Sequence, residues 1–143
     1  MAINLNGALG QYFRSYKGLR QGDPLSPLLF NLVADALSEI LSVASEKGII
    51  RGVCPELVEG DLTHLQYADD TVLFLQYLED DIINLKFLLF CYEELSGMKI
   101  NYLRSKVFTV GLSEQESQRV ADVFNCKLGS FPMRYLGLPI SDR

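Results

Sequence analysis

The stretch that decides the fold reads Leu62-Thr63-His64-Leu65-Gln66-Tyr67-Ala68-Asp69-Asp70-Thr71-Val72-Leu73-Phe74-Leu75. Residues 62–67 alternate as the two faces of a strand do, and residues 72–75 form an apolar run with β-branched and aromatic side chains. The polar residues between these segments include two adjacent carboxylates. The pattern predicts a β-hairpin with Ala68, Asp69 and Asp70 at its tip.

The adjacent carboxylates Asp69 and Asp70 allow two interpretations. Asp disfavours strand interiors and suits tight turns, so the pair could simply be turn residues in water. Carboxylates held side by side on a stiff hairpin can also share hard divalent cations such as Mg²⁺, which need oxygen ligands in a near-octahedral arrangement. Spacing alone favours the turn interpretation, because adjacent acidic residues are common in turns.

Length and composition predict one domain with a real hydrophobic core, since 48% of the 143 residues are apolar. The net charge of −5 and the pI of about 4.8 have the wrong sign for a free-standing binder of phosphate backbones. Cys54, Cys91 and Cys126 show no pairing or zinc pattern, so neither a disulfide partner nor a zinc site is expected.

The chain shows no signal-peptide pattern, and no apolar run approaches the roughly 20 residues of a membrane span. An intracellular protein without membrane contact is expected. The one histidine, His64, lies in a strand pattern and is interpreted as a packed or hydrogen-bonded residue. Catalysis by a Ser/His or Cys/His arrangement has little support.

Other local signals predict the rest of the fold. Asn6-Gly7 between apolar stretches indicates a type I′ hairpin. Helical spacing predicts helices over about 25–45 and from Asp80 or Asp81 to Gly97, and a capping box at Ser113 predicts a third over about 114–124. Short strands are expected near residues 49–53, 107–110 and 133–138. This order favours an α+β sandwich: a largely antiparallel sheet with two to three helices packed on one face.

A Gly- and Pro-rich loop, residues 18–27, leads directly into the first helix. Asp23 could cap that helix, and Pro24 or Pro27 could occupy its first turn. A Gly-rich loop before a helix also exposes backbone N–H groups, here beside Arg20, to an anion or a nucleotide. On these residues alone, the structural interpretation is preferred.

Four motifs taken together carry a resemblance: Arg20–Phe30, Tyr67–Asp70, Ser96–Asn101 and Tyr135–Pro139. In this order, and over nearly the whole chain, they closely resemble reverse transcriptases of plant non-LTR retrotransposons. The resemblance implies that residues 1–143 are a partial reverse transcriptase domain, a polymerase palm lacking its fingers, first strand and thumb. It also implies an RNA template, a DNA primer and deoxynucleoside triphosphates as partners, and a nuclear setting.

The resemblance also assigns roles to residues. Asp69 and Asp70 become the catalytic, metal-binding carboxylates, which in the complete enzyme share two Mg²⁺ ions about 4 Å apart. The loop and helix start resemble the segment against the templating base and incoming nucleotide, with small residues allowing close approach. The residues carried over for template or nucleotide are Arg20, Gln21, Gly22, Pro24 and Arg104. Tyr135, Leu136 and Gly137 resemble the hairpin that grips the primer.

Two departures from the family pattern stand out. No Asp or Glu precedes Arg20, whereas the family's first palm strand supplies a further metal-binding Asp. Two carboxylates alone would fix two metals poorly, and this catalysis depends on fixed geometry. Arg104 stands where the family has a lysine thought to protonate pyrophosphate, and arginine neutralises charge but hardly donates a proton.

Three functions follow as hypotheses. The first is a fragment of an RNA-directed DNA polymerase, active in a longer or complemented protein and inactive as an isolated chain. The second is a non-enzymatic retroelement remnant that folds poorly. The third is a bare RNA- or DNA-binding module, in which aromatic side chains interleaved with basic ones stack bases. Its residues are Tyr12, Phe13, Arg14, Tyr16, Lys17, Arg20, Lys99, Tyr102, Arg104 and Lys106.

Overall fold

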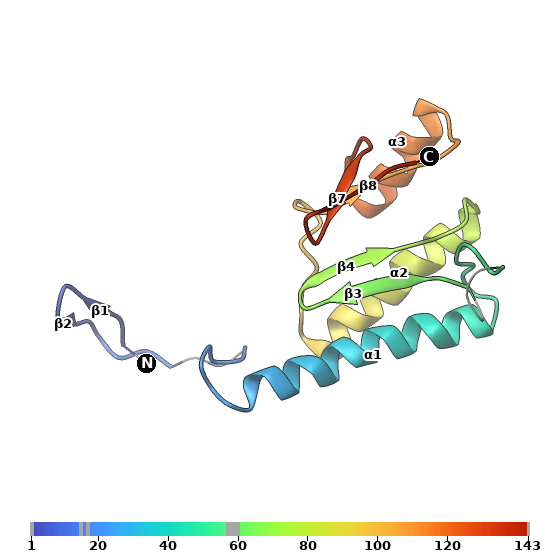
Figure 1. Cartoon of the computed structure of the whole chain (residues 1–143). Helices are drawn as coiled ribbons and strands as arrows, with labels where there is room; N and C mark the ends of the chain where they lie inside the picture. Colours follow the sequence, from blue (N-terminus) through green and yellow to red (C-terminus); the bar gives the residue numbers. More distant parts are fainter. Residues whose placement is uncertain (1, 15, 17, 57–60, 143) are drawn as a thin grey trace. The chain divides into compact units, whose positions relative to one another are not determined.

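The computed structural model describes residues 2–14, 16, 18–56 and 61–142, and this part of the chain contains three helices and eight short strands (Figure 1). In chain order they are β1 (Asn4–Leu5), β2 (Ala8–Leu9), α1 (Ser26–Glu46), β3 (His64–Tyr67), β4 (Asp70–Leu73), α2 (Glu79–Ser96), β5 (Lys106–Val107), α3 (Glu114–Phe124), β6 (Lys127–Leu128), β7 (Met133–Tyr135) and β8 (Leu138–Ile140). The chain divides into two compact units, Met1–Ala36 and Leu37–Arg143. The predicted α+β class is confirmed.

The strands pair in four separate two-stranded ladders. β1–β2, β3–β4 and β7–β8 are antiparallel hairpins, and β5–β6 is parallel. Pairing is therefore largely antiparallel, as expected, but the strands described here do not join into one continuous sheet. The reason is local: three of the ladders close through two-residue turns between strands of only two to four residues.

The first unit holds the β1–β2 hairpin and the start of α1. Asn6 and Gly7 have φ of 51° and 87°, the left-handed values of a type I′ turn, so the predicted hairpin is confirmed. The helix expected over about 25–45 is α1, which begins at Ser26 and ends at Glu46.

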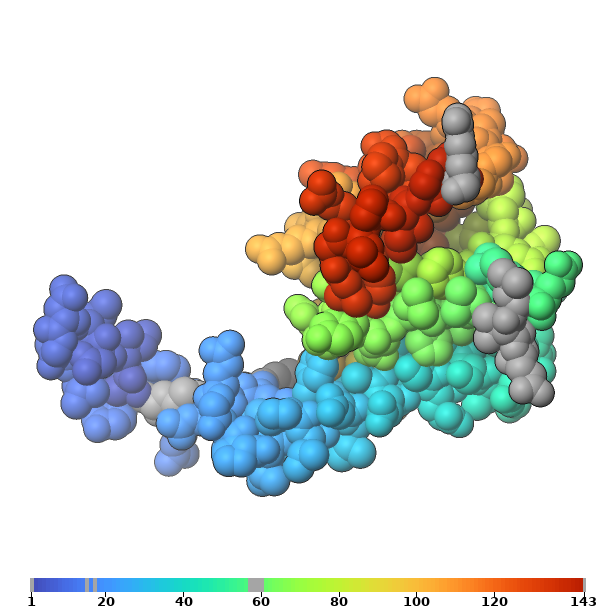
Figure 2. All heavy atoms as spheres, in the orientation of Figure 1, coloured from blue at the N-terminus to red at the C-terminus, as the bar shows by residue number. Residues whose placement is uncertain are grey.

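The second unit has its core between α1, α2 and the β3–β4 hairpin, which lies over both helices in Figure 1. The spheres of the hairpin in Figure 2 lie directly against the C-terminal half of α1. Burial of apolar surface, mostly on α1 and α2, supplies the main stabilisation of the unit. The buried apolar residues are Leu37, Leu41, Ala44, Ile50, Ile82, Leu85, Leu89, Tyr92 and Ala121.

One helix corrects an expectation about membrane spans. By length and composition α1 could cross a membrane, with a mean hydropathy of 1.5, so the expectation that no apolar run approaches a span was wrong. The reason is its composition, since Asp35 and Glu39 are the only charged residues between Ser26 and Ser45. In the second unit α1 buries Leu37, Leu41 and Ala44 on one stripe, as a helix packed on a sheet does. No second helix of this kind occurs among the residues described.

The strand expected near residues 49–53 is not formed; only an isolated bridge joins Val53 to Leu62. Side chains, rather than a neighbouring strand, accept hydrogen bonds from the backbone N–H groups there. Asp81 Oδ2 accepts the Arg51 N–H at 2.9 Å, and Asp61 Oδ2 accepts the Gly52 N–H at 3.1 Å. A Cβ on Gly52 would lie 2.4 Å from the Leu62 carbonyl oxygen, so the two segments pack too closely for any other residue. Residues 57–60 of this connection lie outside the described part.

The helix predicted to end at Gly97 is confirmed as α2, whose C-cap is Gly97 at a φ of 70°. Beyond it, α3 connects the parallel pair β5–β6. The strand predicted over 107–110 is β5, which ends at Val107, and β6 was not predicted. Phe108 packs against Phe131 in a tilted arrangement, with ring centroids 5.5 Å apart and ring planes at 56°.

The strand predicted over 133–138 is wrong in shape: the structure has the hairpin β7–β8 there. Leu136 and Gly137 form its turn, with φ of 51° and 83°. Leu rarely adopts a positive φ, so Leu136 gave no turn signal, and the sequence pattern predicted one uninterrupted strand. The hairpin that the family resemblance implied for Tyr135–Gly137 is therefore present.

Loss of the α3 N-cap should lower stability measurably. The predicted capping box is confirmed, since Ser113 Oγ accepts the Glu116 N–H at 3.3 Å and Glu116 Oε2 accepts the Ser113 N–H at 2.9 Å. We expect Ser113→Ala to lower the free energy of unfolding by about 1 kcal/mol in urea denaturation. Ser113→Thr, which keeps a hydroxyl that can both accept from the Glu116 N–H and donate to its carboxylate, should stay near the parent chain. Equal losses in both variants would contradict the capping role.

Candidate functional site

The β3–β4 hairpin holds the candidate site at its tip. The register pairs Tyr67 with Asp70 and Gln66 with Thr71, so the predicted hairpin is confirmed. Its turn is Ala68-Asp69, with Ala68 at a φ of 51°, and Asp70 is already the first residue of β4. The tip is thus one residue shorter than expected, and both carboxylates sit at the closed end of the ladder.

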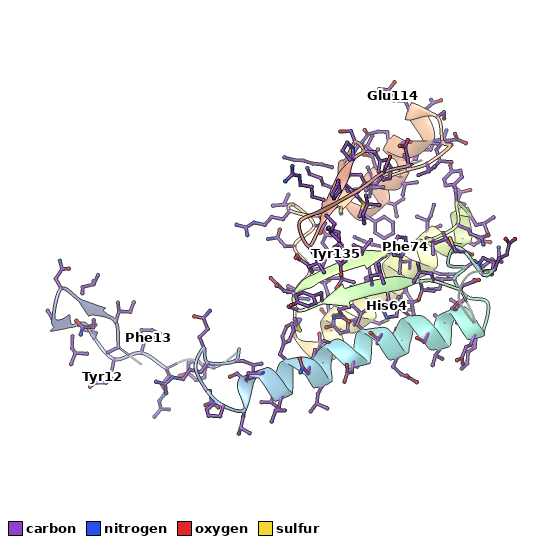
Figure 3. The ribbon with its side chains drawn as sticks, viewed as in Figure 1. Tyr12, Phe13, His64, Phe74, Glu114 and Tyr135 are labelled. Carbon is purple, nitrogen blue, oxygen red and sulfur yellow. The ribbon has the colours of Figure 1, made fainter. Side chains whose placement is uncertain are left out.

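The two faces of the hairpin differ in what they contact. His64 and Gln66 face α1 and form hydrogen bonds with Ser38, which confirms the interpretation of His64 as a hydrogen-bonded residue. Figure 3 shows His64 between the hairpin and α1. Because paired residues share a face, Asp70 lies on the opposite face with Tyr67, which is 63% exposed. Asp69 and Asp70 are both exposed to solvent.

The carboxylate pair has the oxygen chemistry that Mg²⁺ prefers. Mg²⁺ usually binds one or two protein carboxylates and completes its octahedron with water and substrate phosphates. Asp69 and Asp70 fit that partial set, because both are exposed at the tip. Among the described residues, no group of three His, Cys, Asp or Glu side chains could hold a metal ion. Among the described residues the tip therefore offers two carboxylates to a metal ion, without a third candidate ligand beside them.

The loop before α1 is ordered by its own side chains. Ser26 Oγ donates to the Arg20 carbonyl at 2.7 Å, and Asp23 Oδ1 accepts the Leu25 N–H at 2.9 Å. Because α1 begins at Ser26, Asp23 orders the loop before the helix and is not its N-cap, so the predicted capping role is wrong. Gly22 has a φ of 82°, which a side chain would strain. The residues of this loop carried over for template or nucleotide, Arg20, Gln21, Gly22 and Pro24, are all exposed and belong to the first unit.

Arg104 lies in a turn after α2. Its N–H donates to Asn101 Oδ1 at 3.2 Å, and its side chain is exposed. Buried Glu93 fixes the segment before this turn, since Glu93 Oε1 accepts the Ile100 N–H at 2.7 Å. Sequence reasoning missed Glu93, because a helix pattern does not distinguish a buried carboxylate from an exposed one.

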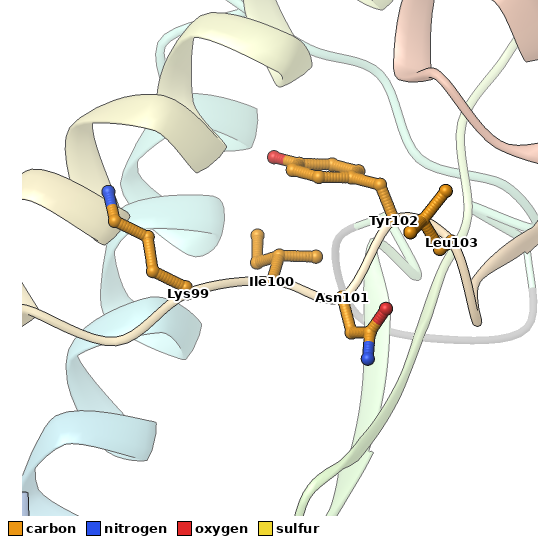
Figure 4. A pocket seen from close by; sticks show the side chains of 5 residues that line it. All are labelled: Lys99, Ile100, Asn101, Tyr102 and Leu103. Atoms are coloured by element: carbon orange, nitrogen blue, oxygen red, sulfur yellow. The ribbon is translucent and has the colours of Figure 1, made fainter.

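The same turn borders an open hollow of about 360 Å³ lined by Lys99, Ile100, Asn101, Tyr102 and Leu103 (Figure 4). Lys99 Nζ donates to Glu94 Oε1 at 2.8 Å, and this hydrogen bond raises the pKa of Lys99. Lys86 Nζ lies 3.9 Å from the centre of the Tyr102 ring, in a cation–π contact. Burial, followed by the charge of Glu93, raises the pKa of Tyr102. These contacts fix Tyr102 to α2.

The predicted site residues fall on separate elements. Tyr135, Leu136 and Gly137 lie on the β7–β8 hairpin, where Tyr135 is half-buried (Figure 3). Within the described ranges, no hydrogen bond or ion pair joins Asp69 or Asp70 to Arg104 or to this hairpin. The two hairpins are present, and the site roles of their residues stay predictions.

Comparison with known proteins gives the family. A family model described as reverse transcriptase (RNA-dependent DNA polymerase) matches residues 1–140. The chain belongs to the reverse transcriptase family. Its carboxylate hairpin, turn after α2 and β7–β8 hairpin all lie within the matched residues.

The relatives are retroelement proteins or uncharacterized. The chain is 36% identical over 121 residues to a retrovirus-related Pol polyprotein from a type-2 retrotransposable element of Drosophila melanogaster, covering 82% of this chain and 10% of the relative. It is 42% identical over 67 residues to an uncharacterized mitochondrial protein of Arabidopsis thaliana, covering 47% of this chain and 55% of that protein. A Nasonia vitripennis Pol polyprotein from a type-1 retrotransposable element is 39% identical over 67 residues, covering 47% of this chain and 6% of the relative.

These relatives confirm a reverse transcriptase domain of a non-LTR element. The chain covers 10% and 6% of the two Pol polyproteins and 55% of the mitochondrial protein. A plant origin stays a prediction, since the relatives come from a plant and from insects.

Proposed function

We propose that this chain forms part of an RNA-directed DNA polymerase in which Asp69 and Asp70 bind Mg²⁺. The observation that carries the proposal is the exposed carboxylate pair at the closed end of β3–β4, on a hairpin whose other face is bonded to α1. The reverse transcriptase family match over residues 1–140 supports it. Of the two interpretations of the carboxylate pair, this proposal adopts metal binding.

The metal would supply charge stabilisation for the attacking 3′-oxygen and the leaving pyrophosphate. Asp69 and Asp70 would hold it by carboxylate oxygens, from backbone positions fixed by the hairpin register. Arg20 and Arg104 would neutralise template or nucleotide phosphates, and Gly22 with Pro24 would allow the nucleotide to approach closely. The turn Tyr135–Gly137 would contact the primer end.

We further propose that the isolated chain is inactive. No Asp or Glu precedes Arg20, so the pair at the hairpin tip would bind metal without the third carboxylate that the family resemblance implies. RNA template, DNA primer and deoxynucleoside triphosphates are the proposed partners of the complete enzyme, within the cell and at the nucleus.

A graft tests this function. In it, this chain replaces the matching 121-residue region of the Drosophila polyprotein. We expect Mg²⁺-dependent extension of a DNA primer on an RNA template by the graft, and none by the 143-residue chain alone. The unmodified Drosophila polyprotein is the control for expression and assay. A folded graft without activity, beside an active control, would favour the non-enzymatic remnant.

Binding of single-stranded nucleic acid is a second candidate. Tyr12 and Tyr16 are 83% and 85% exposed, so their rings are available to stack on bases. Lys17, expected to act with them, lies outside the described residues. Binding through phosphates should weaken steeply as salt rises, and binding that ignores salt would contradict this candidate.

A further inference from the structure

One polar cluster joins the carboxylate hairpin to α1. Ser38 Oγ donates to Gln66 Oε1 at 3.2 Å, and His64 Nε2 lies 3.0 Å from Ser38 Oγ. Thr63 Oγ1 lies 2.9 Å from His64 Nδ1. The cluster links His64 and Gln66 of β3 to Ser38 of α1, which lies 26 positions before His64 and 28 before Gln66.

The hydrogen bonds favour one arrangement of the protons. With the hydroxyl hydrogen of Ser38 donated to Gln66 Oε1, Ser38 accepts from His64, and Nε2 carries the imidazole proton. In the neutral ring Nδ1 then accepts from the Thr63 hydroxyl. Every donor in this chain of bonds has one acceptor, and among the described residues no buried side-chain N or O atom lacks a partner.

We propose that Ser38 and His64 are positioning residues for the Asp69–Asp70 hairpin, acting as a hydrogen-bonded clamp between α1 and β3. This inference rests on the proposed function for its effect on metal binding. The hairpin strands are four residues long and pair only with each other among the described residues, so no neighbouring strand fixes their placement on the helix. The clamp acts at His64 and Gln66, on the face opposite Asp70.

A neutral His64 suits this arrangement. Protonation would make Nδ1 a donor, so the Thr63 hydroxyl would change from donor to acceptor, and its own hydrogen would need another partner at a residue that is only 6% exposed. Burial lowers the pKa of His64 below its ordinary value of 6.5, in the same direction.

Burial is the one cause of the lowered pKa of His64, and no charged group on the described surrounding elements adds to it. Asp35 and Glu39 on α1 are exposed, and Asp70 on β4 is on the other face of the hairpin. On α2, Asp81 and Glu93 accept backbone N–H groups of Arg51 and Ile100. Burial is therefore the cause that acts on His64.

The sign of the pH effect follows from linkage. Because the folded-state pKa of His64 lies below 6.5, the unfolded chain binds a proton more readily. The stabilising contribution is fully present above the unfolded value and is lost as the pH falls through the lowered folded value. Between about pH 7.5 and about pH 5.8, the urea midpoint of the parent chain should fall more than that of His64→Gln.

The first test uses the whole 143-residue chain. Imidazole ¹⁵N shifts at about pH 7.5 should show the Nε2–H form, and Ser38→Ala should speed hydrogen exchange of the β3–β4 ladder amides by roughly threefold to tenfold. Ser38→Thr, which keeps the hydroxyl, should restore slow exchange. Ser42→Ala, at an exposed serine on the same helix, is the matched control. An Nδ1–H ring, or unchanged exchange in Ser38→Ala, would overturn the clamp.

The second test measures the Mg²⁺ concentration for half-maximal primer extension by the graft. Ser38→Ala should raise it about threefold or more while Ser42→Ala leaves it unchanged. An unchanged Mg²⁺ dependence in Ser38→Ala would overturn the effect on metal binding and leave the polymerase assignment intact. An inactive graft would instead contradict the proposed function, and hydrogen exchange would still decide whether the clamp exists.

Discussion

Asp69→Asn in the graft is expected to lower the rate of Mg²⁺-dependent primer extension by at least about a hundredfold. Asparagine keeps the shape of the side chain and the turn preference of the position, but it removes the negative charge that we propose holds the cation. Asp70→Asn should have an effect of similar size, since both carboxylates occupy the hairpin tip. Extension of a labelled primer at saturating nucleotide gives the rate.

Asp80→Asn is the matched control for this prediction. Asp80 is an exposed carboxylate in the first turn of α2, away from the hairpin in the sequence, and its replacement should leave the rate within about twofold. If Asp69→Asn extends primers as fast as the parent graft, the assignment of the carboxylate pair to the metal is wrong. If Asp80→Asn loses as much activity, the loss reflects general damage to the protein.

Leu89→Ala should have the largest effect on stability, lowering the free energy of unfolding of the chain by about 2–5 kcal/mol. Leu89 is 4% exposed on the buried side of α2, so truncation removes apolar contacts and leaves a cavity. Leu95→Ala is the control on the same helix, because Leu95 is 82% exposed and should cost less than about 0.5 kcal/mol. Urea denaturation followed by helical circular dichroism measures both.

This comparison also tests whether the chain folds by itself. Equal effects of the two leucine substitutions would show that the α2 core is not formed in solution. A parent chain without a cooperative transition would support the remnant hypothesis, which the large exposed apolar surface on the described elements motivates.

Local signals predicted most elements because their causes are local. The predicted bounds of α3 match the observed ones. Its N-terminus is capped by Ser113 and Glu116, two residues close together in the sequence. The hairpin around Asp69 followed from strand alternation on both sides of a polar tip. The candidate metal ligands could be named for the same reason, with the family resemblance deciding between two interpretations of one motif.

The features that were missed depend on distant residues or unusual backbone. The pattern of residues 49–53 predicts a strand. In the structure the Arg51 N–H instead donates to the carboxylate of Asp81, which is 30 positions away in the sequence. The turn at Leu136 has a residue that rarely adopts positive φ, so no turn signal marked it. His64 was predicted to be hydrogen-bonded, whereas its partner Ser38 lies too far along the chain for a pattern to reveal.

Metal rescue of Asp69→Cys in the graft tests the central claim most directly. A thiolate binds Mg²⁺ poorly and softer divalent ions better, so metal preference should follow the ligand if Asp69 touches the cation. For Asp69→Cys we predict loss of primer extension in Mg²⁺ and partial recovery in Mn²⁺ or Cd²⁺. For the control Asp80→Cys, the metal dependence of the extension rate should match that of the parent graft. Full activity of Asp69→Cys in Mg²⁺, or loss in every metal by a correctly folded protein, would contradict the assignment of this hairpin as the polymerase metal site.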